Sequence, residues 1–221
     1  MAAFRHAVTP SDWGSLQSAS ITMNSPSTNP TPPRPAIFLD RDNTLIEDPG
    51  YIHDPDQVQL LPGVAAAIAR ARAAGYLAVV VTNQSGLARG RITEAGLDTV
   101  HARLRELLVR AGTSLDAIYH CPYLPGEEAT VEKYRRDSDL RKPKPGMLLL
   151  AAREMNIDLA RSWMIGDSDR DVQAGRAAGC RTILIGQRDS QPPEADHVAA
   201  DLPSAVEIVL SSKDREYPAA P

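Results

Sequence analysis

The amino-acid sequence predicts an α/β fold, a Rossmann-like doubly wound parallel sheet. Three observations lead to this prediction: short apolar runs alternate with segments of helical periodicity, glycine and proline separate the two, and polar clusters directly follow the runs. A strand, a helix and a second strand form a right-handed crossover, so the strands become parallel and helices cover both faces of the sheet. Such sheets bind their ligands at the carboxyl ends of the strands.

Five apolar runs are the predicted strands. The run LAVVVT gives the strongest signal, because it is rich in branched side chains. The predicted strands cover residues 36–39, 77–82, 115–120, 163–166 and 182–186.

Five segments with apolar residues at helical spacing are the predicted helices. The second is the clearest, since Thr93 is a good N-cap and Gly112 a good stop. The predicted helices cover residues 63–75, 93–112, 145–155, 171–179 and 203–210.

Length and composition predict one domain between two tails. Residues 1–35 and 213–221 are rich in serine, proline and other small or polar residues, so we expect disordered tails around a domain at 36–212. The chain has 24 basic and 28 acidic residues, a balance that gives no general attraction to nucleic acid or to anionic lipid. It contains no apolar stretch of membrane-spanning length, and its two cysteines fit a reducing cytoplasm.

Polar clusters follow the predicted strands, as the fold class requires. They read DRDNTL after the first strand, TNQSG after the second and GDSDRD after the fourth, and RKPKPG precedes the third helix. Each cluster alone fits an ordinary turn or helix cap. The set does not, because acids, a hydroxyl and a lysine would converge on one patch, and a buried acidic patch is costly without a cation.

The residue types in this patch favour phosphoryl transfer. Carboxylates without a His/Cys cluster indicate Mg²⁺, which binds carboxylates together with substrate phosphate oxygens. A metal, a lysine and a hydroxyl can clamp a phosphoryl group, and a carboxylate beside them can attack phosphorus. A second acid two residues further on can protonate the leaving oxygen and then activate water. The pattern therefore predicts hydrolysis of a phosphate monoester.

In this order the motifs IFLDRDNTL, VVVTNQSG, RKPKPGM and MIGDSDRD resemble those of the haloacid dehalogenase superfamily. The resemblance implies that Asp40 is the nucleophile and Asp42 the general acid/base. It implies that Asp40, the main-chain carbonyl of Asp42, and Asp167 hold Mg²⁺. It also implies that Thr82 and Lys142 stabilise the transferring phosphoryl group.

More narrowly, DPGYIHD, IYHCPYLP and RKPKPGMLL resemble the histidinol-phosphatase-like subfamily. This resemblance implies removal of the 7-phosphate of D-glycero-D-manno-heptose 1,7-bisphosphate through an aspartyl phosphate, with histidinol phosphate as the alternative substrate. The substrate contacts that it implies are Asp48, Pro49, Gly50, Tyr51, Thr82, Asn83, Gln84, Ser85, Arg141 and Lys142.

The chain departs from the family pattern at two places. Asn43 stands where the family usually has glycine, and asparagine also tolerates a left-handed turn. The subfamily commonly has a zinc loop of four ligands, whose matching positions here are Cys121, Tyr123, Ser138 and Leu140. One thiolate cannot hold a tetrahedral zinc site, so we expect no structural zinc, and the loop must be ordered by packing and charge pairs or stay mobile.

The motifs lie too close together for a separate cap domain, so we expect loops alone to cover the site. Such an open site admits other substrates. A polynucleotide 3′-phosphatase would need a basic groove, which the acidic balance does not favour. A non-catalytic phosphate-binding module is disfavoured because both Asp40 and Asp42 are present. We therefore expect a cytoplasmic enzyme, a monomer with a small sugar-phosphate substrate and neither nucleic-acid nor membrane partners.

Overall fold

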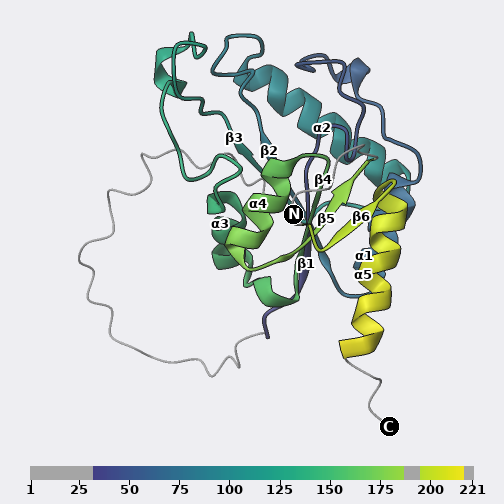
Figure 1. Cartoon of the computed structure of the whole chain (residues 1–221). Coiled ribbons are helices and arrows are strands. Elements are labelled where there is room, and N and C mark those ends of the chain that lie inside the picture. Colours follow the sequence, from purple (N-terminus) through teal and green to yellow (C-terminus); the bar gives the residue numbers. More distant parts are fainter. Residues whose placement is uncertain (1–31, 187–194, 217–221) are drawn as a thin grey trace, which may run out of the picture.

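The computed structural model describes residues 32–186 and 195–216 (Figure 1). Six parallel strands form one sheet in the order β3-β2-β1-β4-β5-β6. The strands are β1 (Ala36–Leu39), β2 (Leu77–Asn83), β3 (Ala117–Cys121), β4 (Trp163–Gly166), β5 (Arg181–Ile185) and β6 (His197–Ala199). The α-helices are α1 (Val64–Ala73), α2 (Glu94–Arg110), α3 (Gly146–Met155), α4 (Asp169–Ala178) and α5 (Leu202–Glu216). Short 3-10 turns are η2 (Pro55–Gln57), η3 (Glu132–Tyr134) and η4 (Leu159–Arg161).

Helices cover both faces of the sheet, because alternate side chains of its strands are apolar on both sides. In β1, Ile37 and Leu39 lie in the core that α1, α2 and α5 cover. Ala36 and Phe38 lie in the core that α3 and α4 cover. Figure 1 shows these two helix layers on either side of the sheet. The predicted doubly wound α/β architecture is therefore confirmed.

The strand order changes direction at β1, and this positions the site. The chain leaves β1 for β2 on one side and later returns to β4 on the other. Loops that leave neighbouring strands in opposite directions open a crevice at the carboxyl ends of those strands. Just beyond β1, the main-chain N–H of Asp40 donates to Ile165 O at 3.0 Å. The polar residues after β1 and β4 thus start at adjoining positions.

The structure shifts several predicted element ends, each for a local reason. β3 begins at Ala117 instead of residue 115, because the Asp116 carboxylate accepts a hydrogen bond from Ala78 N (2.8 Å). α4 begins at Asp169 instead of residue 171, because Ser168 caps it and forms a capping box with Asp171.

Two further differences lie towards the C-terminus. α5 runs to Glu216, past residue 212, where the sequence placed the end of the domain. The three-residue strand β6 was not predicted, and among the described strands it pairs with β5 alone, at the edge of the sheet. The predicted disordered tails were 1–35 and 213–221, and of these residues 1–31 and 217–221 lie outside the described residues. Arg34 forms a β-bridge with Ile157, and residues 213–216 belong to α5, so these parts of the predicted tails belong to the fold.

Within the described residues, the two chain segments that connect β1 to β2 and β2 to β3 hold one α-helix each, α1 and α2. These segments contain no separate cap domain, as predicted. None of the described helices combines the length and the apolar character that crossing a bilayer requires.

Candidate active site

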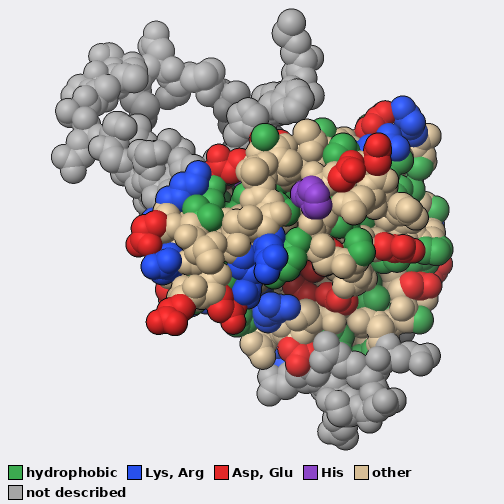
Figure 2. All heavy atoms as spheres, turned by 90° about the horizontal axis from the view of Figure 1, so that it is seen from above, with side chains coloured by type: hydrophobic (Ala, Val, Ile, Leu, Met, Phe, Trp, Pro, Cys, Tyr) green, Lys and Arg blue, Asp and Glu red, His purple; other side chains and the backbone are tan. Residues whose placement is uncertain are grey.

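A cavity of about 280 Å³ lies at the carboxyl ends of β1, β2 and β4. Figure 2 looks onto this edge of the molecule and shows basic side chains beside a recess that holds acidic ones. The predicted site residues that line the cavity are Asp40, Asp42, Asp48, Gly50, Tyr51, Thr82, Asn83, Gln84, Ser85, Arg141, Lys142 and Asp167. Pro49 is the one predicted site residue that does not line it. Four motifs that are far apart in the sequence therefore meet in one place.

The Lys142 ammonium joins two carboxylates at the floor of the cavity. Its Nζ lies 2.7 Å from Asp40 Oδ1 and 2.6 Å from Asp171 Oδ1, and it also donates to Val81 O at 2.7 Å. Burial alone would lower the pKa of Lys142, but the charges of Asp40 and Asp171 raise it above its ordinary value. Lys142 is therefore held as a charged donor although it is buried.

Asn83 fixes the backbone of Lys142. Its Nδ2 donates to Lys142 O at 2.9 Å, and its Oδ1 accepts from Lys142 N at 3.1 Å. Asn83 ends β2, so this paired hydrogen bond attaches the Lys142 loop to the sheet. Asn83 also lines the cavity, and its role as a substrate contact stays a prediction.

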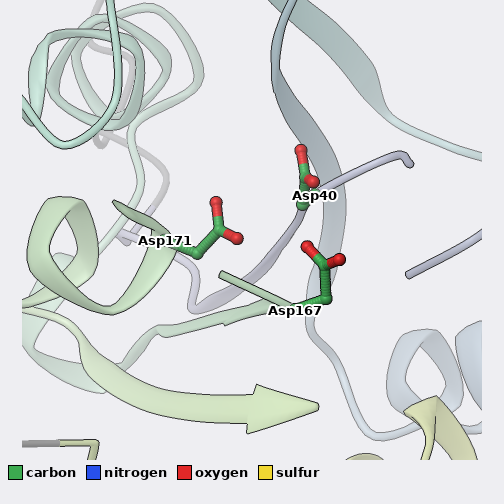
Figure 3. A group of neighbouring side chains, drawn as sticks. All are labelled: Asp40, Asp167 and Asp171. Atoms are coloured by element: carbon green, nitrogen blue, oxygen red, sulfur yellow. The ribbon is translucent and has the colours of Figure 1, made fainter. Parts of the chain in front are cut away.

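Three carboxylates converge beside Lys142. One oxygen from each of Asp40, Asp167 and Asp171 lies within 4.8 Å of the other two (Figure 3). Burial raises the pKa of Asp167, and the charge of Asp40 raises it further. Burial likewise raises the pKa of Asp171, to about 7.

This cluster fits a divalent cation. One lysine cannot neutralise three carboxylates, and burial makes the uncompensated charge costly. Oxygen ligands of this kind suit Mg²⁺. Asp171 is already bonded through Oδ1 to Lys142 and through Oδ2 to Ser168 N (3.1 Å), which leaves Asp40 and Asp167 as the better placed metal ligands.

Both carboxylate oxygens of Asp42 are engaged by neighbouring side chains. Oδ1 accepts from Arg41 Nε at 2.7 Å, and Oδ2 accepts from Gln84 Nε2 at 3.0 Å. Gln84 Nε2 also lies 2.9 Å from Thr82 Oγ1, which links the ends of β1 and β2. Burial raises the pKa of Asp42, and the charge of Arg41 opposes this shift. A raised pKa suits a carboxyl group that must hold a proton before donating it.

Asn43 adopts the left-handed conformation (φ 56°) that the sequence predicts at the usual glycine position. Its Oδ1 accepts from Asp48 N at 3.3 Å, so the turn after β1 also anchors the predicted substrate segment.

Arg141 reaches the cavity without an acidic partner. Its Nη1 donates to Tyr123 O at 3.2 Å, and among the described residues it forms no ion pair. The two nearby acids of its loop, Asp137 and Asp139, instead pair with Lys144, at 2.5 and 3.4 Å. Burial lowers the pKa of Arg141, and the charges of Arg170 and Arg89 lower it further. A guanidinium among like charges is placed to accept an anion.

The loop between Cys121 and Leu140 is held by aromatic and charged contacts. The rings of Tyr123 and Tyr134 lie 6.2 Å apart, and the Arg136 guanidinium lies 4.0 Å from the centre of the Tyr123 ring. The Tyr134 hydroxyl donates to Glu94 of α2, and Leu124 N donates to Tyr134 O at 3.1 Å. Packing and charge pairs thus order this loop, the first of the two predicted alternatives.

The residues at the positions matched to the zinc ligands make other contacts in this loop. Burial raises the pKa of the Cys121 thiol, which disfavours a thiolate ligand. The Tyr123 ring packs, and Ser138 Oγ accepts from Leu140 N at 3.2 Å. The expectation that the loop binds no zinc stays a prediction.

Three residues that matter in this site were not among the predicted site residues. Asp171 holds Lys142, Arg41 holds Asp42, and Arg170 lines the cavity beside Arg141. All three stand inside recognised motifs, Arg41 in DRDNTL and both Arg170 and Asp171 in GDSDRD, so the signal for them was membership of a site motif.

Comparison with known proteins gives concordant matches. The family described as HAD-hydrolase-like matches residues 139–207. D-glycero-beta-D-manno-heptose-1,7-bisphosphate 7-phosphatase of Escherichia coli K12 is 43% identical over 180 residues, covering 78% of this chain and 93% of the relative. D-glycero-D-manno-heptose-1,7-bisphosphate 7-phosphatase of Thermosynechococcus vestitus is 43% identical over 193 residues, covering 81% of this chain and 97% of the relative.

Solved structures agree with these relatives. The D,D-heptose 1,7-bisphosphate phosphatase of B. bronchiseptica, complexed with magnesium and phosphate, is similar with a TM-score of 0.70 and 35% identity, covering 80% of this chain and 99% of that one. A HAD-like phosphatase of Mesorhizobium loti is similar with a TM-score of 0.71 and 37% identity, covering 81% of this chain and 88% of that one.

Proposed function

The chain belongs to the D-glycero-D-manno-heptose-1,7-bisphosphate 7-phosphatases of the haloacid dehalogenase-like hydrolases, and from this membership we propose its reaction and the role of each site residue. The enzyme removes the 7-phosphate of D-glycero-D-manno-heptose 1,7-bisphosphate through an aspartyl phosphate. The observation that carries the proposal is Asp40 at the floor of the cavity, bonded to Lys142 and adjacent to Asp167.

In the first half-reaction a carboxylate oxygen of Asp40 attacks the phosphorus of the 7-phosphate. The bond between phosphorus and the sugar oxygen breaks, and its electron pair stays on that oxygen. Asp42 gives its proton to the same oxygen, so the sugar leaves as an alcohol. Lys142 and the Thr82 hydroxyl face the transferring group and stabilise the charge on its oxygens.

In the second half-reaction water attacks the phosphorus of the aspartyl phosphate. Asp42, now a carboxylate, takes a proton from that water. The bond between phosphorus and the Asp40 oxygen breaks, which returns the Asp40 carboxylate and releases inorganic phosphate. Asp42 is thereby protonated again and ready for the next substrate.

Asp40, the main-chain carbonyl of Asp42, and Asp167 are the residues that would hold Mg²⁺. When bound, the ion would offset the repulsion between the carboxylates and the phosphate and draw electron density from the phosphoryl oxygens. The acidic cluster and the magnesium and phosphate in the B. bronchiseptica relative support this assignment.

The open cavity and Arg141 favour a bisphosphate substrate. One phosphate sits over Asp40, while the other meets, at the cavity wall, the guanidinium of Arg141, which forms no ion pair with any described residue. The segment from Asp48 to Tyr51 contacts the sugar, because Asp48, Gly50 and Tyr51 line the same cavity. Binding energy from the distant phosphate orients the reacting one.

A phosphate-release panel tests the proposed function. We expect the highest kcat/KM for the heptose bisphosphate, and ³¹P spectra of its product should retain only the 1-phosphate signal. Fructose 1,6-bisphosphate tests the sugar, and a 3′-phosphorylated oligonucleotide tests the nucleic-acid alternative. A higher kcat/KM for histidinol phosphate would make the chain a histidinol-phosphate phosphatase instead.

A further inference from the structure

Arg41 is a buried arginine between the two aspartates of the DRDNTL motif. Its side chain is 1% exposed, although it carries a permanent charge. Burying such a charge is costly unless each donor finds a partner. The partners of Arg41 therefore show what the residue is placed to do.

Arg41 has two side-chain partners on opposite sides of its guanidinium. Nε donates to Asp42 Oδ1 at 2.7 Å, and Nη1 lies 3.2 Å from His101 Nε2. His101 belongs to α2, and it is buried there against the sheet. Arginine can only donate, so His101 Nε2 is the acceptor and its ring carries the proton on Nδ1. Thus a residue of α2 fixes an arginine that in turn holds Asp42.

The two carboxylate oxygens of Asp42 therefore have different partners. Oδ1 accepts a hydrogen bond from the guanidinium of Arg41, which is buried. Oδ2 meets Gln84, a residue of the cavity wall, and the Asp42 side chain as a whole is 21% exposed. A substrate can therefore reach only Oδ2 without breaking a buried charge pair.

We propose that Arg41 and His101 are positioning residues that turn Asp42 so that Oδ2 carries the proton given to the leaving oxygen. The inference rests on the proposed function, since it assigns to Asp42 the general-acid step described above. In that step the Oδ2–H bond breaks, a new O–H bond forms on the sugar oxygen, and the bond from that oxygen to phosphorus breaks. Arg41 and His101 neither gain nor lose a proton.

The leaving group of the substrate isolates this step. A sugar alkoxide needs the proton of Asp42, whereas p-nitrophenolate leaves without one at neutral pH. A misplaced general acid therefore slows hydrolysis of the sugar phosphate more than that of p-nitrophenyl phosphate. A general loss of folded enzyme lowers both rates by the same factor.

The experiment compares His101→Leu with His101→Gln at the same position. Glutamine keeps an acceptor that can reach Arg41, and leucine removes it. For each variant kcat/KM is measured with the heptose bisphosphate and with p-nitrophenyl phosphate. We expect the ratio of the two kcat/KM values to fall about 10- to 100-fold in His101→Leu, and by less than about threefold in His101→Gln. Arg41→Lys keeps the charge but loses the planar set of guanidinium donors, so we expect the ratio of the two kcat/KM values to fall as much as in His101→Leu.

An unchanged ratio in both His101→Leu and Arg41→Lys would overturn the proposal. If His101→Leu does not fold, Arg41→Lys and His101→Gln decide the question by the same ratio. Failure of the proposed function is a separate outcome, because it appears in the wild-type enzyme as absent hydrolysis of the heptose bisphosphate.

Discussion

Lys142 Nζ bridges Asp40 Oδ1 and Asp171 Oδ1 at 2.7 and 2.6 Å, so one buried ammonium joins the residue after β1 to the first turn of α4. The second carboxylate matters for catalysis, because it shares the charge of Lys142. Without Asp171, Lys142 would pair with Asp40 alone and hold the nucleophile's lone pairs away from phosphorus.

Asp171→Asn should therefore lower kcat by about 10- to 100-fold while the fold is retained. Asparagine keeps the size of the side chain but removes the charge. Steady-state phosphate release measures the loss, and circular dichroism checks the fold. Asp169→Asn is the matched control on the same helix turn, since Asp169 does not line the cavity, and it should stay within about threefold of wild type. Equal losses in the two variants would contradict the role of Asp171.

Activity should require Mg²⁺, because the buried carboxylates of Asp40 and Asp171 and the half-buried carboxylate of Asp167 lie together with one lysine. EDTA should abolish phosphate release, and added Mg²⁺ should restore it while zinc should not.

Elemental analysis of the purified protein should find less than about 0.2 zinc per chain, since Tyr123, Ser138 and Leu140 supply no strong zinc ligand. A stoichiometric zinc would mean that the loop is built differently.

Arg141→Ala should separate substrate selection from chemistry. We expect kcat/KM for the heptose bisphosphate to fall roughly 30- to 1,000-fold, because the remote phosphate loses its guanidinium. For a sugar monophosphate without the second group the loss should be less than about threefold. Lys142→Ala should lower kcat for both substrates. Equal losses on both substrates in Arg141→Ala would mean that Arg141 only supports the loop.

Tyr134→Phe tests the contacts that order the loop between Cys121 and Leu140. The change removes the hydroxyl that donates to Glu94, while the ring that packs near Tyr123 stays. We expect the free energy of unfolding to fall by about 1 kcal/mol. We also expect kcat/KM for the bisphosphate to fall about three- to tenfold, because the carbonyl oxygen of Tyr123 accepts a hydrogen bond from Arg141. Tyr119→Phe is the matched control, since Tyr119 also donates to a glutamate, Glu154 at 2.9 Å, but from β3 to α3. Equal losses of activity in the two variants would contradict the link to Arg141.

Much of the site could be predicted because adjacency in sequence fixes it. Asp40, Thr82 and Asp167 stand at or directly after the apolar ends of parallel strands, and parallel strands end at one edge of a sheet. Asp171 stands four residues after Asp167, and its place depends on how α4 starts. A Cβ at Gly166 would lie 2.4 Å from Asp171 Cγ, so the close packing of α4 on β4 requires glycine there.

Other contacts join distant residues and leave no local pattern. His101 lies in the amphipathic helix α2, and it contacts Arg41, which is 60 residues away in the sequence. The Tyr123 and Tyr134 rings pack because the loop folds back on itself, which the spacing of two tyrosines does not indicate. The expected cytoplasmic location, the monomeric state and the absence of nucleic-acid partners stay predictions.

Chemical trapping of residue 40 tests the central claim, the covalent role of Asp40, most directly. Asp40→Asn should lower turnover by at least about 10³-fold, since it removes the attacking charge and a metal ligand. In the wild-type enzyme, acid quenching during turnover and reduction with borohydride should convert the aspartyl phosphate to homoserine at position 40, detected by peptide mass spectrometry. The account predicts homoserine at position 40 only when both substrate and Mg²⁺ are present. Active enzyme that yields no homoserine there, or yields it at another aspartate, would contradict the account.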